Sequence, residues 1–65
     1  MLKINGKNMP CENALTVQSL LIKLGHDPAR VAVEKNGRIV PRAAFPDEPL
    51  DDGDTLEIVQ FVGGG

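Results

Sequence analysis

The residues with the clearest chemical potential are three consecutive glycines, Gly63, Gly64 and Gly65, which end the sequence. Glycine lacks a Cβ, so the tail can take almost any backbone conformation and leaves the carboxylate of Gly65 unshielded. At about 3.3–3.6 Å per residue, three extended glycines reach roughly 10 Å, enough to present the terminal carbonyl carbon to a nucleophile inside a partner's tunnel. The alternative is a frayed chain end. The strand-forming run 59–62, joined to the glycines without a polar linker, favours the functional interpretation.

Two side chains, Cys11 and His26, could act as a nucleophile and a base. A nucleophilic cysteine needs a positive environment, but Cys11 has Glu12 beside it, and the single histidine falls in a predicted loop. One cysteine cannot form an intramolecular disulfide, and there is no Cys/His cluster for zinc. We therefore expect an inert, partly buried Cys11, a solvated His26, no metal, and the reducing setting of the cytoplasm.

Length and charge exclude several classes of protein. Sixty-five residues make one domain, 1–65, with a small core. A net charge of −2 and only two aromatic residues, Phe45 and Phe61, argue against a nucleic-acid partner. No segment approaches the roughly 20 apolar residues of a membrane span, and the N-terminus lacks the apolar run of a signal peptide. We expect a monomer when the domain is free.

Acidic residues gather late in the chain with no base among them. Two interpretations are open: a solvated loop with turn-forming aspartates, or an acidic rim that steers the domain onto a basic enzyme. The cluster consists of Asp47, Glu48, Asp51, Asp52 and Asp54.

One helix is predicted over residues 17–24. Thr16 suits its N-cap position. Apolar residues at i, i+3, i+4 and i+7 form one stripe, from which Ile22 departs, so the stripe is expected to pack on a sheet. Gly25 is placed to end the helix in a left-handed conformation.

Strands are predicted on both sides of the helix. Two Asn-Gly dipeptides, at 5–6 and 36–37, are strong signals for tight hairpins, and Asp52-Gly53 turns the chain into a last strand. The predicted strands are residues 2–5, 7 to about 11, 31–35, 38–40 and 55 to about 61.

The last strand changes character near its end. Up to Ile58 it alternates apolar and polar residues, but Val59 and Phe61 then continue the polar face. An apolar pair on the solvent side predicts a docking surface just before the tail. The alternative is that Phe61 folds over an edge of the core.

Hairpin, helix, hairpin and final strand predict an α+β fold, the β-grasp, with a mixed four- to five-stranded sheet and one main helix on one face. The last strand is expected in the middle, beside the first, because it is the most hydrophobic. Phe45 is expected to close the core from the irregular segment. The other predicted core residues are Leu2, Ile4, Val17, Leu20, Leu21, Leu24, Val33, Leu50, Leu56 and Ile58.

Four segments together resemble the ThiS family, the ubiquitin-like sulfur carriers of thiamin biosynthesis. They are the helix start 16–21 (TVQSLL), the central motif 36–42 (NGRIVPR), the turn 52–54 (DGD) and the end 61–65 (FVGGG). The resemblance extends over essentially the whole chain. A terminal diglycine alone would be a weak signal, but combined with the central motif at this length it is specific.

The resemblance implies a carrier that is not an enzyme. Gly65 would be adenylated by an ATP-using, E1-like activating enzyme, with ATP bound by that enzyme and no cofactor bound by this chain. Sulfur from a donor such as a cysteine desulfurase would then convert the adenylate to a thiocarboxylate, which serves thiazole synthase. Val59, Phe61, Val62, Gly63 and Gly64 would contact the partners.

Two other functions fit the same tail. The small subunit of molybdopterin synthase shares the fold and the tail chemistry, although the short chain and the motif 36–42 favour the thiamin carrier. A ubiquitin-like modifier or a non-covalent binding module would also end in glycines. Conjugation to lysines would identify the modifier, and a dispensable tail would identify the binding module.

Overall fold

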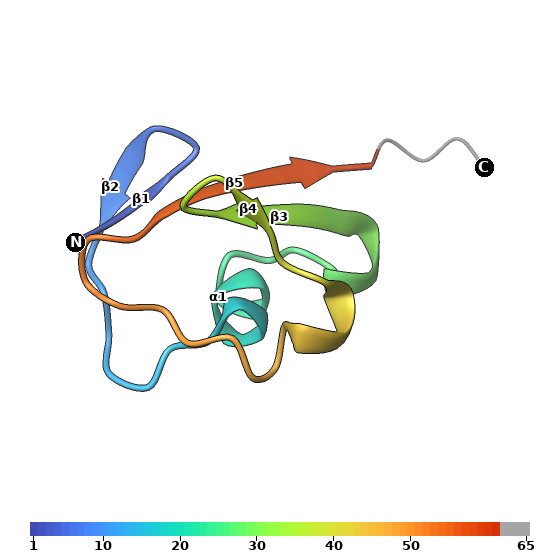
Figure 1. Ribbon diagram of the computed structural model, residues 1–65, viewed down its shortest axis with the longest axis horizontal. Coiled ribbons are helices and arrows are strands. Elements are labelled where there is room, and N and C mark those ends of the chain that lie inside the picture. Colours follow the sequence, from blue (N-terminus) through green and yellow to red (C-terminus); the bar gives the residue numbers. More distant parts are fainter. Residues whose placement is uncertain (62–65) are drawn as a thin grey trace.

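A computed structural model describes residues 1–61; the predicted partner-contact residue Val62 and the predicted glycine tail, Gly63, Gly64 and Gly65, lie outside the described residues. Within residues 1–61, five strands form one mixed sheet, and a single α-helix lies against one of its faces (Figure 1). The elements are β1 (Leu2–Ile4), β2 (Lys7–Met9), α1 (Val17–Lys23), the 3₁₀ turn η1 (Pro28–Arg30), β3 (Val31–Lys35), β4 (Arg38–Ile39), the 3₁₀ turn η2 (Arg42–Ala44) and β5 (Thr55–Gln60).

The last strand occupies the centre of the sheet, as predicted. The strand order is β2-β1-β5-β3-β4. β5 runs parallel to β1, with Ile4 opposite Leu56, and antiparallel to β3, with Val33 opposite Ile58. The two hairpins therefore flank the C-terminal strand, which is the β-grasp arrangement.

Both Asn-Gly dipeptides form tight turns, and their asparagine side chains form hydrogen bonds to β5. Asn5 and Asn36 have φ values of 49° and 51°, and the glycines that follow them are left-handed as well, as two-residue hairpins require. The side-chain amide of Asn5 accepts a hydrogen bond from the Ile58 N–H (2.7 Å) and donates one to the Ile58 carbonyl (3.1 Å). On the other side of β5, the Asn36 side chain accepts the Thr55 N–H at 2.9 Å.

The helix begins at Val17, as the sequence predicts, and ends at Lys23, one residue before the predicted end. The Thr16 hydroxyl accepts the Ser19 N–H, and the Ser19 hydroxyl accepts the Thr16 N–H, so the two residues form a capping box. Gly25 adopts φ 83° directly after the cap residue Leu24. Leucine could not take that conformation without strain, so the glycine allows the chain to leave the helix.

The core lies between α1 and the sheet. Nine of the ten listed core predictions are confirmed, and Phe45 is also buried, but Leu24 was wrong: it is 39% exposed. The apolar period continues through Leu24, whereas the helix ends at Lys23 and leaves the leucine at the cap, on the rim of the core. The buried residues missing from the prediction are Leu15, Val31 and Val40.

The element boundaries differ modestly from the prediction. β2 ends at Met9 instead of Cys11, because Pro10 has no N–H to continue the ladder. β4 ends at Ile39, and Val40 turns into the core. The turns η1 and η2 were not predicted.

The orientation of α1 gives a stability test with a neighbouring control. Leu21 is fully buried, so Leu21→Ala should lower the free energy of unfolding by about 2–5 kcal/mol. Ile22 is 60% exposed, and Ile22→Ala should change that free energy by no more than about 0.5 kcal/mol. Urea unfolding of both variants measures the difference; equal losses would mean that the helix does not pack in this orientation.

Candidate functional site

The sheet holds the chain as far as Phe61, two residues before the predicted glycine tail. Gln60 pairs with Val31 at the end of the β3–β5 ladder. One residue further, the Phe61 N–H donates to the Arg30 carbonyl at 2.8 Å. The described chain thus ends on a fixed backbone, immediately before Val62.

Val59 and Phe61 face solvent, as predicted. Their side chains are 58% and 54% exposed, so the alternative in which Phe61 folds over the core is wrong. Val59 lies opposite the half-buried Ala32 on β3. Ile39 on β4, which is 67% exposed, pairs with Glu34 on the same sheet. The outer face of the sheet therefore carries apolar side chains near the tail; whether a partner docks there stays a prediction.

Two glutamates share that outer face. Glu34 on β3 lies directly opposite Glu57 on β5, and both are exposed. Neither carboxylate forms an ion pair within residues 1–61. Like charges directly opposite each other on a sheet are destabilising, so a basic side chain placed between them by a partner would relieve the repulsion.

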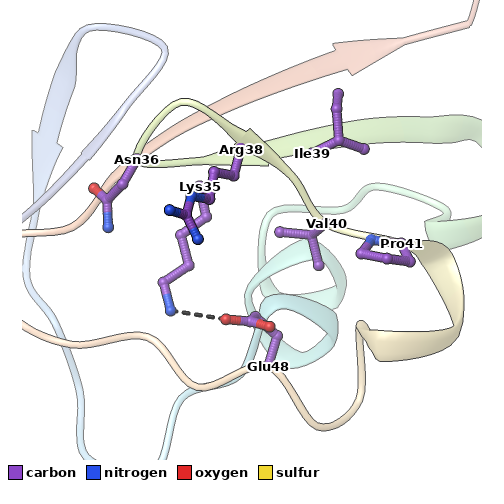
Figure 2. Close-up of a pocket in the computed structure, with 7 residues that line it drawn as sticks. All are labelled: Lys35, Asn36, Arg38, Ile39, Val40, Pro41 and Glu48. Carbon is purple, nitrogen blue, oxygen red and sulfur yellow. Dashed lines mark hydrogen bonds and ion pairs between the residues drawn. The ribbon is translucent and has the colours of Figure 1, made fainter.

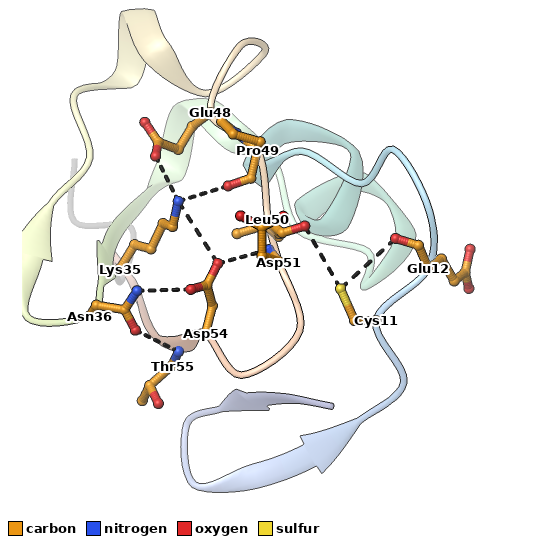
Figure 3. A network of polar contacts seen from close by, with 10 residues as sticks. All are labelled: Cys11, Glu12, Lys35, Asn36, Glu48, Pro49, Leu50, Asp51, Asp54 and Thr55. Carbon is orange, nitrogen blue, oxygen red and sulfur yellow. Dashed lines mark hydrogen bonds and ion pairs between the residues drawn. The ribbon is translucent and has the colours of Figure 1, made fainter.

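Lys35, at the opposite end of β3 from Arg30, ties the sheet to the irregular segment (Figure 3). Its ammonium donates to Glu48 Oε2 at 2.9 Å and to the Pro49 carbonyl at 2.8 Å, and it lies 3.8 Å from Asp54 Oδ2. The side chain is only 17% exposed. The sequence did not reveal this role, since it depends on the path of the chain after η2.

Asp54 closes the turn that leads into β5 (Figure 3). Its carboxylate accepts hydrogen bonds from the Asp51 N–H at 2.8 Å and from the Asn36 side-chain amide at 2.9 Å. Asn36, the first residue of the motif 36–42, therefore binds both the turn and the strand that follows it.

In the folded chain, basic groups from other segments lie beside the acidic cluster. Lys35 neutralises Glu48 and Asp54, and the N-terminal ammonium pairs with Asp52. In the part of the chain that the structure describes, only Asp47 and Asp51 of the cluster form no ion pair. These contacts favour a structural role for most of the cluster over a steering rim.

A surface hollow lies between the β3–β4 hairpin and the irregular segment (Figure 2). Its volume is about 570 Å³, and the Lys35–Glu48 ion pair spans it. The lysine is already committed to protein acceptors, so the hollow belongs to the structural network. Its lining residues are Lys35, Asn36, Arg38, Ile39, Val40, Pro41 and Glu48.

Cys11 and His26 take no part in the tail anchor, which is the hydrogen bond from the Phe61 N–H to the Arg30 carbonyl. Cys11 is half-buried, as predicted, with Sγ 3.8 Å from the Leu50 carbonyl (Figure 3). His26 was expected to be solvated but is half-buried; its backbone N–H donates to the Leu21 carbonyl at 2.8 Å. Within residues 1–61, no group of three or more His, Cys, Asp or Glu side chains could hold a metal ion. No helix in that range is long and apolar enough to cross a membrane.

Comparison with known proteins places the chain in a family. Residues 2–65 match the model of the ThiS family. The chain belongs to this family. The solved structure of the thiamine biosynthesis protein ThiS from Geobacter metallireducens is 39% identical and superimposes with a TM-score of 0.80, over 98% of this chain and 97% of that one. The match confirms the β-grasp fold and the sulfur carrier family of thiamin biosynthesis.

Other relatives include a protein of similar length and a much longer one. The sulfur carrier protein ThiS of Bacillus subtilis is 38% identical over 66 residues, which is the whole of both chains. The thiazole synthase of Paramagnetospirillum magneticum is 47% identical over 64 residues, or 98% of this chain and 20% of that protein. The chain thus spans about a fifth of the length of that synthase.

The network around Lys35 shifts two pKa values. The hydrogen bond to Glu48 is the main cause that raises the pKa of Lys35; burial opposes it, and the carboxylates of Glu48, Asp54 and Asp51 add to the rise. Burial alone would raise the pKa of Asp54, but hydrogen bonds from Asp51 and Asn36 and the charge of Lys35 together lower it. The charged forms of both residues are therefore favoured in the folded state.

A depressed pKa at Asp54 predicts the pH dependence of its contribution to stability. The contribution is present above the unfolded pKa of about 4 and is lost as the pH falls through the lower folded value. Asp54→Asn should cost about 1–3 kcal/mol at neutral pH, and the gap to wild type should narrow below about pH 4. Urea unfolding across pH measures this gap. Asp47→Asn is the control, expected to stay within about 0.5 kcal/mol at neutral pH; a pH-independent gap for Asp54→Asn would contradict the assignment.

Proposed function

We propose that this ThiS-family domain carries sulfur on the carboxylate of Gly65 for the thiazole ring of thiamin. Membership of the family supports the carrier role. The observation that carries the proposal is the hydrogen bond from the Phe61 N–H to the Arg30 carbonyl, because it fixes the chain at a point separated from the glycine tail by Val62 alone. A rigid body with a short unbranched extension suits delivery of a terminus into an active site.

The chemistry needs two steps at one carbon. A carboxylate is a poor electrophile, so an activating enzyme joins the Gly65 carboxylate to the α-phosphoryl group of ATP and releases pyrophosphate. The terminal sulfur of a persulfide, formed from cysteine on a desulfurase or a related donor, then attacks the carbonyl carbon, and AMP leaves with the electrons of the broken C–O bond. A second thiol cleaves the S–S bond of the resulting acyl disulfide and forms a disulfide with the donor's sulfur. The product is a C-terminal thiocarboxylate. The enzymes supply the catalytic groups, and this chain acts as their protein substrate.

Thiazole synthase is the proposed recipient of the sulfur. Support comes from the similarity between this chain and a fifth of the thiazole synthase of Paramagnetospirillum magneticum. A domain of this type within the length of a synthase indicates that the two work together.

Val59 and Phe61 form the proposed docking site on the body. Both are exposed beside the tail anchor, on the face that also carries Glu57. Apolar anchors with a charged neighbour are typical of interfaces that combine affinity with orientation.

The position of the carboxylate gives the decisive test. An alanine appended after Gly65 keeps the body unchanged but places a methyl group beside the carbon to be activated and moves that carbon by one residue. A small misplacement of reacting atoms can lower a rate by about 10²-fold. We therefore expect no measurable ATP–pyrophosphate exchange with the activating enzyme and no gain of sulfur by intact mass.

Deletion of Gly65 is the companion variant, and it should fail because the shortened tail does not reach. Both variants should keep wild-type unfolding curves and still bind the activating enzyme through the body. Activation of the alanine-extended protein at the wild-type rate would reject the tail as the functional end and leave a ubiquitin-like binding module.

The docking site gives a separate test. Phe61→Ala should weaken binding to the activating enzyme and to thiazole synthase by more than about 1 kcal/mol if the ring is an anchor. Ile22→Ala, which removes an apolar side chain of similar exposure from α1, is the control and should bind normally. Titration calorimetry on folded variants decides; unchanged affinity of Phe61→Ala for both partners would exclude the site.

A further inference from the structure

The side chain of Arg42 forms hydrogen bonds to the backbone around the start of β3. It is the last residue of the motif 36–42 and the first of η2. Its Nε donates to the Pro28 carbonyl at 3.1 Å, and its Nη2 donates to the Val31 carbonyl at 3.1 Å. A guanidinium holds its donors in a fixed fork, so the two carbonyls are locked at a set separation.

The segment locked by Arg42 is the one that anchors the tail. Pro28 and Val31 bracket Arg30, whose carbonyl accepts the Phe61 N–H at 2.8 Å. In Figure 1, η2 lies beside the end of the sheet at which β5 stops. Arg42 is thus connected to Phe61 through one short turn of backbone.

The anchor needs support because it is the end of a ladder. Terminal hydrogen bonds open most easily in folded proteins, and Phe61 is held by a single one beyond the Val31–Gln60 pair. η1 contributes its own restraint, since the Asp27 carboxylate accepts the Ala29 N–H at 2.9 Å. Arg42 adds the tertiary restraint: it forms no ion pair in the described part of the chain and directs its charge to two carbonyls.

We propose that Arg42 is a positioning residue for activation of the tail. By locking η1 and the start of β3, it keeps the Arg30 carbonyl in place for Phe61, and so fixes the point and direction from which the tail extends. This inference rests on the proposed sulfur-carrier function. Its consequence is kinetic: the body docks as before without Arg42, but the Gly65 carboxylate reaches the reacting position less often.

The test uses full-length Arg42→Met, which keeps the length of the side chain and removes its donors. ATP–pyrophosphate exchange by the activating enzyme is measured while the carrier concentration is varied. We expect kcat to fall by about tenfold or more, with KM for the carrier within about twofold of wild type. A loss of folded protein alone would raise the apparent KM and leave kcat unchanged. Arg42→Lys, which keeps one donor group, should recover part of kcat.

Lys35→Met is the matched control, because it breaks a buried contact at the other end of β3. It should keep the wild-type kcat even if it is less stable. Amide hydrogen exchange of Phe61 should be faster in Arg42→Met and unchanged in Lys35→Met under conditions where both are folded. Wild-type kcat and wild-type Phe61 exchange in Arg42→Met would overturn the inference. Failure of the wild-type carrier to be activated would instead overturn the proposed function, and the exchange experiment would still test the anchor.

Discussion

The structure depends on the insertion of β5 between β1 and β3. The hairpins β1–β2 and β3–β4 become one sheet only when this last strand pairs with both of them, because β1 and β3 are not neighbours in the strand order. Leu56 and Ile58 project from β5 into the core. The parallel pairing joins residues 52 positions apart, such as Lys3 and Thr55, and the entropy of closing so long a loop must be offset by burial and hydrogen bonds formed together.

The side chains of Asn5 and Asn36, in the two hairpin turns, form hydrogen bonds to β5 that the turn conformation itself does not require. Glycine in place of Asn5 or Asn36 would satisfy the left-handed backbone, but it could not offer an amide to β5. Asn5 continues the β1 side of the ladder with its side chain, and Asn36 does the same on the β3 side. The turns therefore close the hairpins and also clamp the strand that leads to the tail.

The apolar periodicity of the sequence predicted correctly those features that depend on neighbouring residues in the chain. The i, i+3, i+4 period separated Leu21 from Ile22, and the alternation after Ile58 placed Val59 and Phe61 on the solvent face. The same period wrongly predicted that Leu24 is buried. The helix ends at Lys23, so Leu24 is the C-cap residue although the apolar stripe continues to it. The partners of Lys35 and Arg42 could not be predicted, since contacts such as Lys35 to Glu48, 13 residues apart, depend on how the segment between them folds back.

The pairing of β5 on both sides also has a mechanical consequence. If the tail enters a partner's active site, as proposed, it must later be withdrawn, and a pull along the axis of β5 would then act on the strand to which the tail is joined. Because β5 lies between β1 and β3, such a force loads the flanking hydrogen bonds together, in shear. A strand at the edge of the sheet would resist the same pull with hydrogen bonds on one side only. The central position of β5 thus makes the domain resistant to unfolding when force is applied through the tail.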